Sequence, residues 1–157
     1  MDGLPVTLLT SSSWLRPVTT AILLALAVVT VALDQLSKAL VTSRLQEGQR
    51  VVLAGGSGLR RVTNVRGGLL PLSDWWAFLL WLAIVACLGV VIALGSPLRS
   101  ADAMGLGLIL GGATSNLVDR LMRGGVVDFI AVGRWPTFNL ADAAMVAGTA
   151  LAVWSLL

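Results

Sequence analysis

Histidine is absent from this 157-residue sequence, and cysteine occurs once, at Cys87. Without histidine the chain cannot assemble a Ser-His-Asp triad, a Cys-His nucleophile pair or a histidine-based zinc site. Cys87 lies within an apolar run, where it has no partner for an internal disulfide and no basic neighbour to activate its thiol. We therefore predict a packing role for Cys87, and we expect neither a metal ion nor a cofactor.

Charge is also scarce, because 12% of the residues are charged and 57% are hydrophobic. Soluble domains carry about 25% charged residues, so the composition indicates a membrane protein of about one domain in length. The formal net charge is +3, but the arginines are scattered between apolar runs and form no stripe with interleaved aromatics. This pattern argues against a nucleic-acid partner.

Four apolar segments predict four transmembrane helices, at about residues 18–38, 75–94, 103–121 and 139–157. Pro17 is placed where a proline commonly precedes a helix. A cleaved signal peptide is the alternative for the first segment, since Arg16 precedes its apolar core. The run is longer than a typical signal core and no clear cleavage site follows it, so we expect an uncleaved helix. Gly107 and Gly111 have a spacing that lets helices pack closely.

The first long loop, residues 42–73, is polar, basic and rich in glycine. VVL (51–53) and LRRVTNV (59–65) have strand character and flank the turn-forming AGGSG. We predict a small β-hairpin or sheet at the membrane surface, and a plain loop over residues 123–136. The predicted fold is thus an all-α membrane protein, one domain of residues 1–157, with four transmembrane helices and one small β element.

The stretch from Asn116 to Asp142 holds three of the eight acidic residues between two apolar segments. Ionisable groups at the edge of a bilayer are costly and usually functional. Asn116, Asp119, Arg120 and Arg123 follow the spacing of one helical face, so Asp119 can pair with Arg123, and Arg120 can bind a neighbouring carboxylate. A carboxylate paired in this way stays ionised, which favours a structural role for Asp119.

Asp128 and Asp142 have different surroundings. Asp128 lies in the apolar VVDFI, and Asp142 is three residues after Asn139 in the first turn of the last predicted helix. The Pro136-containing segment between the two acids allows both to face one point. Two carboxyl groups in such a site can share one proton, so that one polarises a carbonyl while the other activates water. A pair of helix caps and a proton relay are the alternatives, and the residues alone leave them open.

Asp34 and Lys38 are one helical turn apart and can form an ion pair. The pair can simply end a helix at the level of the lipid headgroups, or it can support a site.

Three motifs resemble those of the lipoprotein signal peptidases, the signal peptidase II family: SNLVDR (115–120), VVDF (126–129) and FNLAD (138–142). LDQLSK (33–38) resembles the D-x-x-x-K element of that family, and Asn64 with Gly67 and Gly68 lies where the family has an Asn followed by small residues. The resemblance covers essentially the whole chain. It implies an aspartic endopeptidase that removes the signal peptide of diacylglyceryl-modified prolipoproteins, cutting before the lipid-modified cysteine.

The resemblance also assigns roles. Asp128 and Asp142 match the catalytic pair. The positions that match site support or substrate binding are Asn116, Asp119, Arg120, Asn139, Asn64, Asp34 and Lys38. The implied partners are a lipid-modified prolipoprotein, membrane lipids and globomycin-type inhibitors, with no metal, cofactor or nucleic acid. A catalytically altered homologue and a membrane subunit that relays protons or ions are the alternative functions.

The chain departs from the family pattern at two places. NVRGGLL (64–70) has Arg66 in place of a small residue and Leu69 in place of an aromatic one, and Ser115 replaces a glycine. The two acids are unchanged, whereas substrate preference and inhibitor sensitivity can differ from those of the family.

Sidedness gives conflicting indications. The resemblance implies the bacterial cytoplasmic membrane, with both termini in the cytoplasm and the site on the extracytoplasmic side. In this arrangement only Arg16 and Arg99 lie on the cytoplasmic side, and the other nine basic residues lie with the loops. The positive-inside tendency alone would place those loops in the cytoplasm. We follow the motifs and expect the outer arginines to meet anionic headgroups.

Overall fold

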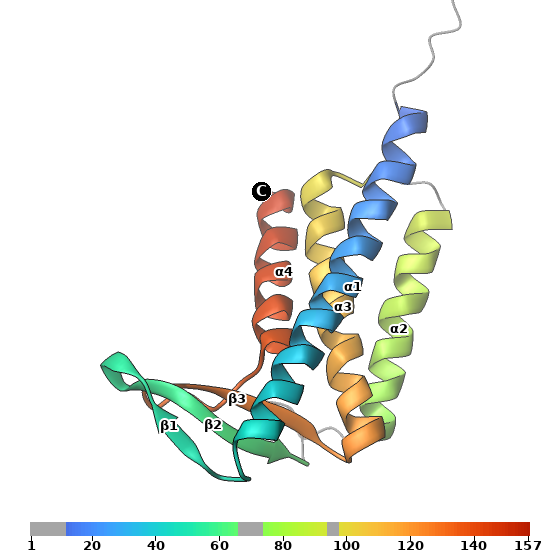
Figure 1. Cartoon of the computed structure of the whole chain (residues 1–157). Coiled ribbons are helices and arrows are strands. Elements are labelled where there is room, and N and C mark those ends of the chain that lie inside the picture. Colours follow the sequence, from blue (N-terminus) through green and yellow to red (C-terminus); the bar gives the residue numbers. More distant parts are fainter. Residues whose placement is uncertain (1–11, 66–73, 94–97) are drawn as a thin grey trace, which may run out of the picture.

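The computed structural model describes residues 12–65, 74–93 and 98–157. Four helices lie side by side: α1 (Ser12–Arg44), α2 (Asp74–Ala93), α3 (Ser100–Arg123) and α4 (Leu140–Leu156). A small sheet crosses one end of this bundle, and the beginning of α1 and the end of α4 lie at the other end (Figure 1). The four predicted helices are therefore confirmed as helices, at nearly the expected positions.

Helix α1 is longer at both ends than the sequence predicts. It begins at Ser12, so Pro17 lies inside the helix and not before it. A proline in this position removes one backbone donor, and the loss is confined to the first turns. Among the described residues, α1 contains the one helical segment long and apolar enough by itself to cross a membrane, Pro17–Arg44. Shorter apolar segments occur in α2, Trp75–Val90, and in α4, Leu140–Ser155.

Helix α3 is the centre of the bundle, since it contacts α4, α1 and α2. Glycines let its backbone approach its neighbours. A Cβ atom at Gly107 would lie 2.6 Å from the carbonyl oxygen of Leu23, and one at Gly111 would lie 2.7 Å from that of Ala27. On the other side, a Cβ atom at Gly112 would lie 2.5 Å from the carbonyl oxygen of Ala141. The predicted close packing at Gly107 and Gly111 is thus confirmed, and its partner is α1.

The predicted hairpin is present, as β1 (Arg50–Val52) and β2 (Ser57–Asn64), joined through a 3-10 turn at Ala54–Gly56. Gly55 and Gly56 have φ values of 69° and 80°, a backbone conformation that favours glycine.

The loop predicted over residues 123–136 is wrong, because Val126–Val132 forms a third strand, β3. β3 pairs antiparallel with β2, giving the order β1-β2-β3, with Val62 opposite Asp128. Gly124 ends α3 with φ 69° and donates its N–H to the carbonyl of Arg120, as a left-handed cap does. The predicted small β element in the first loop is therefore present, and the second loop adds a strand to it that the sequence did not predict.

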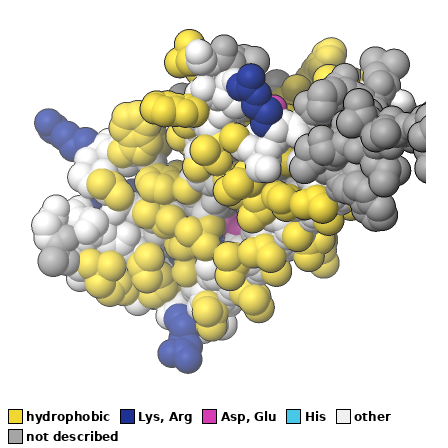
Figure 2. All heavy atoms as spheres, turned by 90° about the horizontal axis from the view of Figure 1, so that it is seen from above, with side chains coloured by type: hydrophobic (Ala, Val, Ile, Leu, Met, Phe, Trp, Pro, Cys, Tyr) yellow, Lys and Arg dark blue, Asp and Glu magenta, His cyan; other side chains and the backbone are white. Residues whose placement is uncertain are grey.

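The surface of the bundle is largely apolar. Seen from the end opposite the sheet, hydrophobic side chains cover most of the described surface and basic ones are few (Figure 2). A buried cluster of Leu23, Leu88 and Ala103 joins α1, α2 and α3. The predicted Gly67-Gly68 element and the departures at Arg66 and Leu69 lie outside the described residues.

Candidate active site

The site forms where β3 meets the beginning of α4. After β3 the chain turns back, and the carbonyl oxygen of Phe138 accepts a hydrogen bond of 2.7 Å from the backbone N–H of Ile130. This return places Asn139 beside Asp128, and Asn139 then caps α4. Two predicted site residues from different elements are thereby brought together.

Asn139 contacts both acids. Its side-chain Nδ2 donates to Asp128 Oδ1 at 2.8 Å, and its Oδ1 accepts from the backbone N–H of Asp142 at 2.9 Å. Its own backbone N–H donates to Asp142 Oδ2 at 3.3 Å. The last two bonds form a capping box, so Asp142 takes part in capping α4 while it also faces the site. The sequence left open that the two acids are helix caps. Asp142 does cap α4, and it also faces the site.

Two further amides reach the acids. Asn116 on α3 donates from Nδ2 to Asp142 Oδ1 at 2.9 Å. Asn64 on β2 donates from Nδ2 to Asp128 Oδ2 at 3.4 Å. Val62 is the residue directly opposite Asp128, so Asn64 is its diagonal neighbour on the same face of the sheet. The strand pairing that the sequence missed is what places Asn64 at the site.

Asp128 is 5% exposed, whereas Asp142 is partly exposed. Burial, and secondarily the nearby charge of Asp142, raise the pKa of Asp128 to about 7. The amides of Asn64 and Asn139 and the charge of Lys38 act in the opposite direction. Below about pH 7 the Asp128 carboxyl is therefore mostly protonated.

A buried ionic network lies behind the acids. Lys38, with no exposed surface, places its Nζ 2.5 Å from Asp34 Oδ2, 2.8 Å from Asp119 Oδ2 and 3.0 Å from Asn116 Oδ1. Asp34 also accepts the backbone N–H of Ala141 at 2.9 Å. The predicted Asp34–Lys38 pair is confirmed. The sequence left open whether the pair lies at the level of the headgroups or supports a site, and the structure buries it between α1, α3 and α4.

Asp119 is fully buried and joins the network to β3. Its Oδ2 accepts the backbone N–H of Val127 at 3.1 Å, and its Oδ1 pairs with Arg123. The predicted Asp119–Arg123 pair is therefore confirmed. Arg120 is partly exposed in the last turns of α3, and its pairing with a carboxylate stays a prediction.

Sequence reasoning missed two members of this network. Gln35 donates from Nε2 to Asp119 Oδ1 at 3.0 Å and to Ser115 Oγ at 2.9 Å. Ser115 donates its hydroxyl to Asp34 Oδ2 at 2.7 Å and has no exposed surface. Ser115 was noted only as a replaced glycine. The one available signal was its position a helical turn before Asp119, on the same face.

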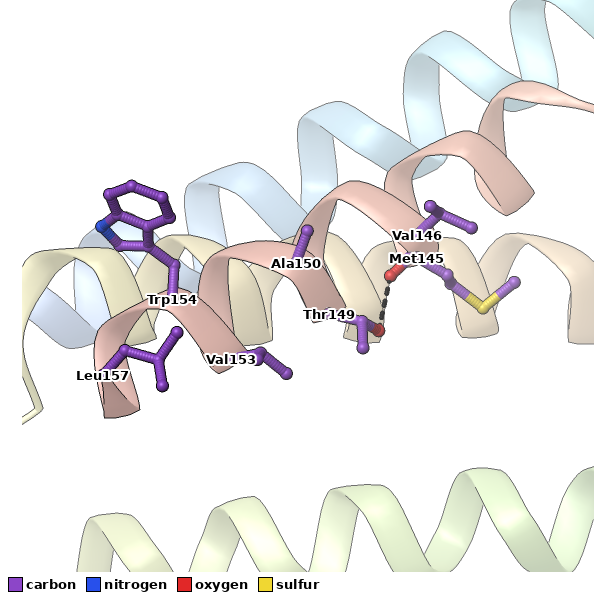
Figure 3. Close-up of a pocket in the computed structure, with 7 residues that line it drawn as sticks. All are labelled: Met145, Val146, Thr149, Ala150, Val153, Trp154 and Leu157. Carbon is purple, nitrogen blue, oxygen red and sulfur yellow. Dashed lines mark hydrogen bonds between the residues drawn. The ribbon is translucent and has the colours of Figure 1, made fainter.

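A groove of about 600 Å³ on the described surface is separate from the acids. It runs along α4 and is lined by seven residues between Met145 and Leu157 (Figure 3). Thr149 contributes the one hydroxyl group of its lining, and this hydroxyl donates a hydrogen bond to the carbonyl of Met145. The seven lining residues include no acidic or basic side chain. No three His, Cys, Asp or Glu side chains gather as metal ligands within the described ranges.

Comparisons with known proteins point to one family. The family described as "Signal peptidase (SPase) II" matches residues 26–157. The lipoprotein signal peptidase of Rhodococcus jostii is 40% identical over 84% of this chain and 70% of its own length. That of Syntrophomonas wolfei is 43% identical over 75% of this chain and 80% of its own. A solved structure described as a bacterial membrane enzyme superposes with a TM-score of 0.77, at 25% identity, over 85% of this chain and 86% of its own.

The ionic network predicts a large effect of Lys38→Met on stability. The substitution leaves two buried carboxylates, of Asp34 and Asp119, without their common cation, and uncompensated buried charge costs about 3–5 kcal/mol. We expect the midpoint of chemical unfolding in detergent to fall sharply. Arg44→Met is the matched control, because Arg44 is an exposed cation in the last turn of the same helix. Equal midpoints for the two variants would contradict the stabilising role of this network.

Proposed function

The chain belongs to the signal peptidase II family, so it is a hydrolase that removes signal peptides from lipoproteins, and we propose that Asp128 and Asp142 carry out the cleavage. The proposed substrate is a prolipoprotein already modified with diacylglycerol, cut before its lipid-bearing cysteine. Globomycin-type cyclic peptides are expected to compete for the same two acids.

One observation carries the proposal: Asn139 bonds both acids at once, through its side chain to Asp128 and through the capping box to Asp142. The bridge holds two carboxyl groups from different elements close enough for the charge of Asp142 to raise the pKa of Asp128. In such a pair one acid is ionised and the other protonated at neutral pH. This is the protonation state that general acid-base hydrolysis of a peptide bond needs.

The proposed reaction requires only water and the two acids. The ionised carboxylate takes a proton from water, and the oxygen attacks the carbonyl carbon of the scissile bond. The protonated acid gives its proton to the carbonyl oxygen, forming a neutral tetrahedral diol. When this intermediate collapses, the acid that gave up its proton takes one back from the diol. The acid that took a proton from water gives that proton to the leaving nitrogen. The C–N bond then breaks, and the pair again shares one proton.

The other predicted site residues are proposed as support. Asn116 and Asn139 hold the acids, and Asn64 lies on the strand edge beside Asp128, where it can also contact substrate. Asp34, Lys38 and Asp119 form the buried base of the site. Arg120 is proposed to help at the rim of the site.

We propose that all four helices span the bacterial cytoplasmic membrane, as one peptidase domain over residues 1–157. Both termini would be cytoplasmic, and the sheet and the acids would lie on the extracytoplasmic side. The charge conflict is smaller than the sequence suggests. Lys38 is buried between two acids, and Arg61 and Arg123 are paired with Glu47 and Asp119. These three cations are therefore not free charges of an outer loop.

Replacing either acid tests the catalytic proposal. We expect Asp128→Asn and Asp142→Asn each to reduce cleavage of a diacylglyceryl-modified precursor by about 10²-fold to 10⁴-fold, measured with purified protein in detergent. Asp102→Asn is the control, because Asp102 caps α3 at the end of the bundle away from the sheet.

Folded variants that cleave normally would exclude the pair as the catalytic groups. A folded wild-type protein that never cleaves would favour the catalytically altered homologue. Normal processing together with lost proton flux in the variants would favour the relay function.

The orientation is tested separately. A reporter that is active only in the cytoplasm should be active when it is fused after Leu157. The same reporter inserted between β1 and β2, after Gly55, should be inactive. Extracytoplasmic activity of the fusion at Leu157 would overturn the proposed orientation.

A further inference from the structure

We propose that Asp142 is the ionised base and Asp128 the proton carrier, and that Lys38 imposes this order by fixing the orientation of the Asn116 side chain. The inference rests on the proposed function of the two acids. It assigns to each acid a separate step and makes Lys38 and Asn116 positioning residues.

The orientation of Asn116 follows from the donors around it. An ammonium group has three N–H donors and no acceptor, and those of Lys38 face Asp34, Asp119 and Asn116 Oδ1. Turning the Asn116 amide around would place its NH₂ against this ammonium, donor against donor. The oxygen of Asn116 must therefore face Lys38, and its Nδ2 is directed to Asp142 Oδ1, 2.9 Å away.

Asn139 reinforces the same orientation. Its Oδ1 accepts the backbone N–H of Asp142, so its Nδ2 must point the other way, toward Asn116 Oδ1, Val127 O and Asp128 Oδ1. The oxygen of Asn116 thus accepts from two donors, Lys38 and Asn139. No flip of either amide satisfies both the ammonium and the backbone N–H.

The two acids consequently receive unequal stabilisation of negative charge. Asp142 accepts the amide of Asn116, which is polarised by the Lys38 ammonium, and the backbone N–H of Asn139. Asp142 also lies in the first turn of α4, where the helix dipole favours an anion. All three stabilise a negative charge on Asp142.

Asp128 has weaker support for a negative charge. It lies in a strand, and it shares the hydrogens of Asn139 Nδ2 with Asn116 and Val127. Its second donor, Asn64, is 3.4 Å away. Burial and the nearby charge of Asp142 raise the pKa of Asp128 to about 7.

Among the residues that the structure describes, few charged groups face the two acids. Lys38 and Asp34 approach from α1, and Asp119 on α3 is held by Lys38 and Arg123. Lys38 has no donor left for a direct hydrogen bond to either acid, so its hydrogen-bonding effect on Asp142 passes through Asn116, while its charge also acts on both acids directly.

The test compares two amide deletions in the pH dependence of kcat/KM, which reports the free enzyme. Asn116→Ala removes a donor from Asp142, which is ionised in the active state, so the acidic limb should move up by about one pH unit and the alkaline limb should stay. Asn64→Ala removes a hydrogen-bond donor that stabilises the ionised form of Asp128. The alkaline limb should then move up, by less than one unit because that bond is long, and the acidic limb should stay.

Opposite limb shifts, with Asn116→Ala moving the alkaline limb and Asn64→Ala the acidic one, would reverse the assignment. A lower rate with both limbs unmoved would reduce Asn116 to a structural residue and overturn the proposal. For a variant that is too slow for kinetics, infrared spectroscopy measures the protonation of the carboxyl groups as a function of pH. This titration follows the same two proton-binding steps without turnover. Wild-type protein that does not cleave, or fully active Asp128→Asn, would instead refute the proposed function.

Discussion

The buried ammonium of Lys38 is the constraint on which the site depends. It has no contact with water in the structure, so it requires Asp34 and Asp119 as partners, and these lie on α1 and α3. Asp34 also accepts the N–H of Ala141 from α4, and Asp119 accepts that of Val127 from β3. One cation therefore fixes the relative positions of four elements. A buried ion pair is weak evidence for stability, but loss of one partner is costly, which makes the arrangement specific.

Two asparagines connect this network to the acids. Asn116 lies between Lys38 and Asp142, and Asn139 lies between Asn116 and Asp128. If either amide flipped, its NH₂ group would face another donor, the Lys38 ammonium or the backbone N–H of Asp142. The two amides therefore hold the acids in position before substrate binds. Preorganised groups of this kind lower a barrier because they need no reorganisation during the reaction. Close glycine-mediated packing of α3 against α1 and α4 brings the helices near enough for these short side chains to meet.

The sequence predicted what depends on local spacing. The Asp34–Lys38 and Asp119–Arg123 pairs follow from one helical turn, and the β1–β2 hairpin follows from its glycine turn. Asp128 was singled out by its apolar surroundings, and Asp142 by its place three residues after Asn139 at the start of a helix. It could not predict β3, whose apolar run shows no alternation and whose partner β2 lies far away in the chain. Ser115 and Gln35 were missed for a related reason. Their roles arise from contacts between α1 and α3, and nothing near them in sequence indicates those contacts.

The proposed hydrolysis requires a protonated Asp128 beside an ionised partner. The most direct measurement is the pH dependence of kcat/KM for wild-type cleavage of a diacylglyceryl-modified precursor. The pKa of Asp128 is raised to about 7, and its carboxyl must keep its proton to act. We therefore expect a bell-shaped profile whose alkaline limb falls through about pH 7. Activity that stays constant from well below pH 7 to well above it would contradict catalysis by a proton-sharing pair.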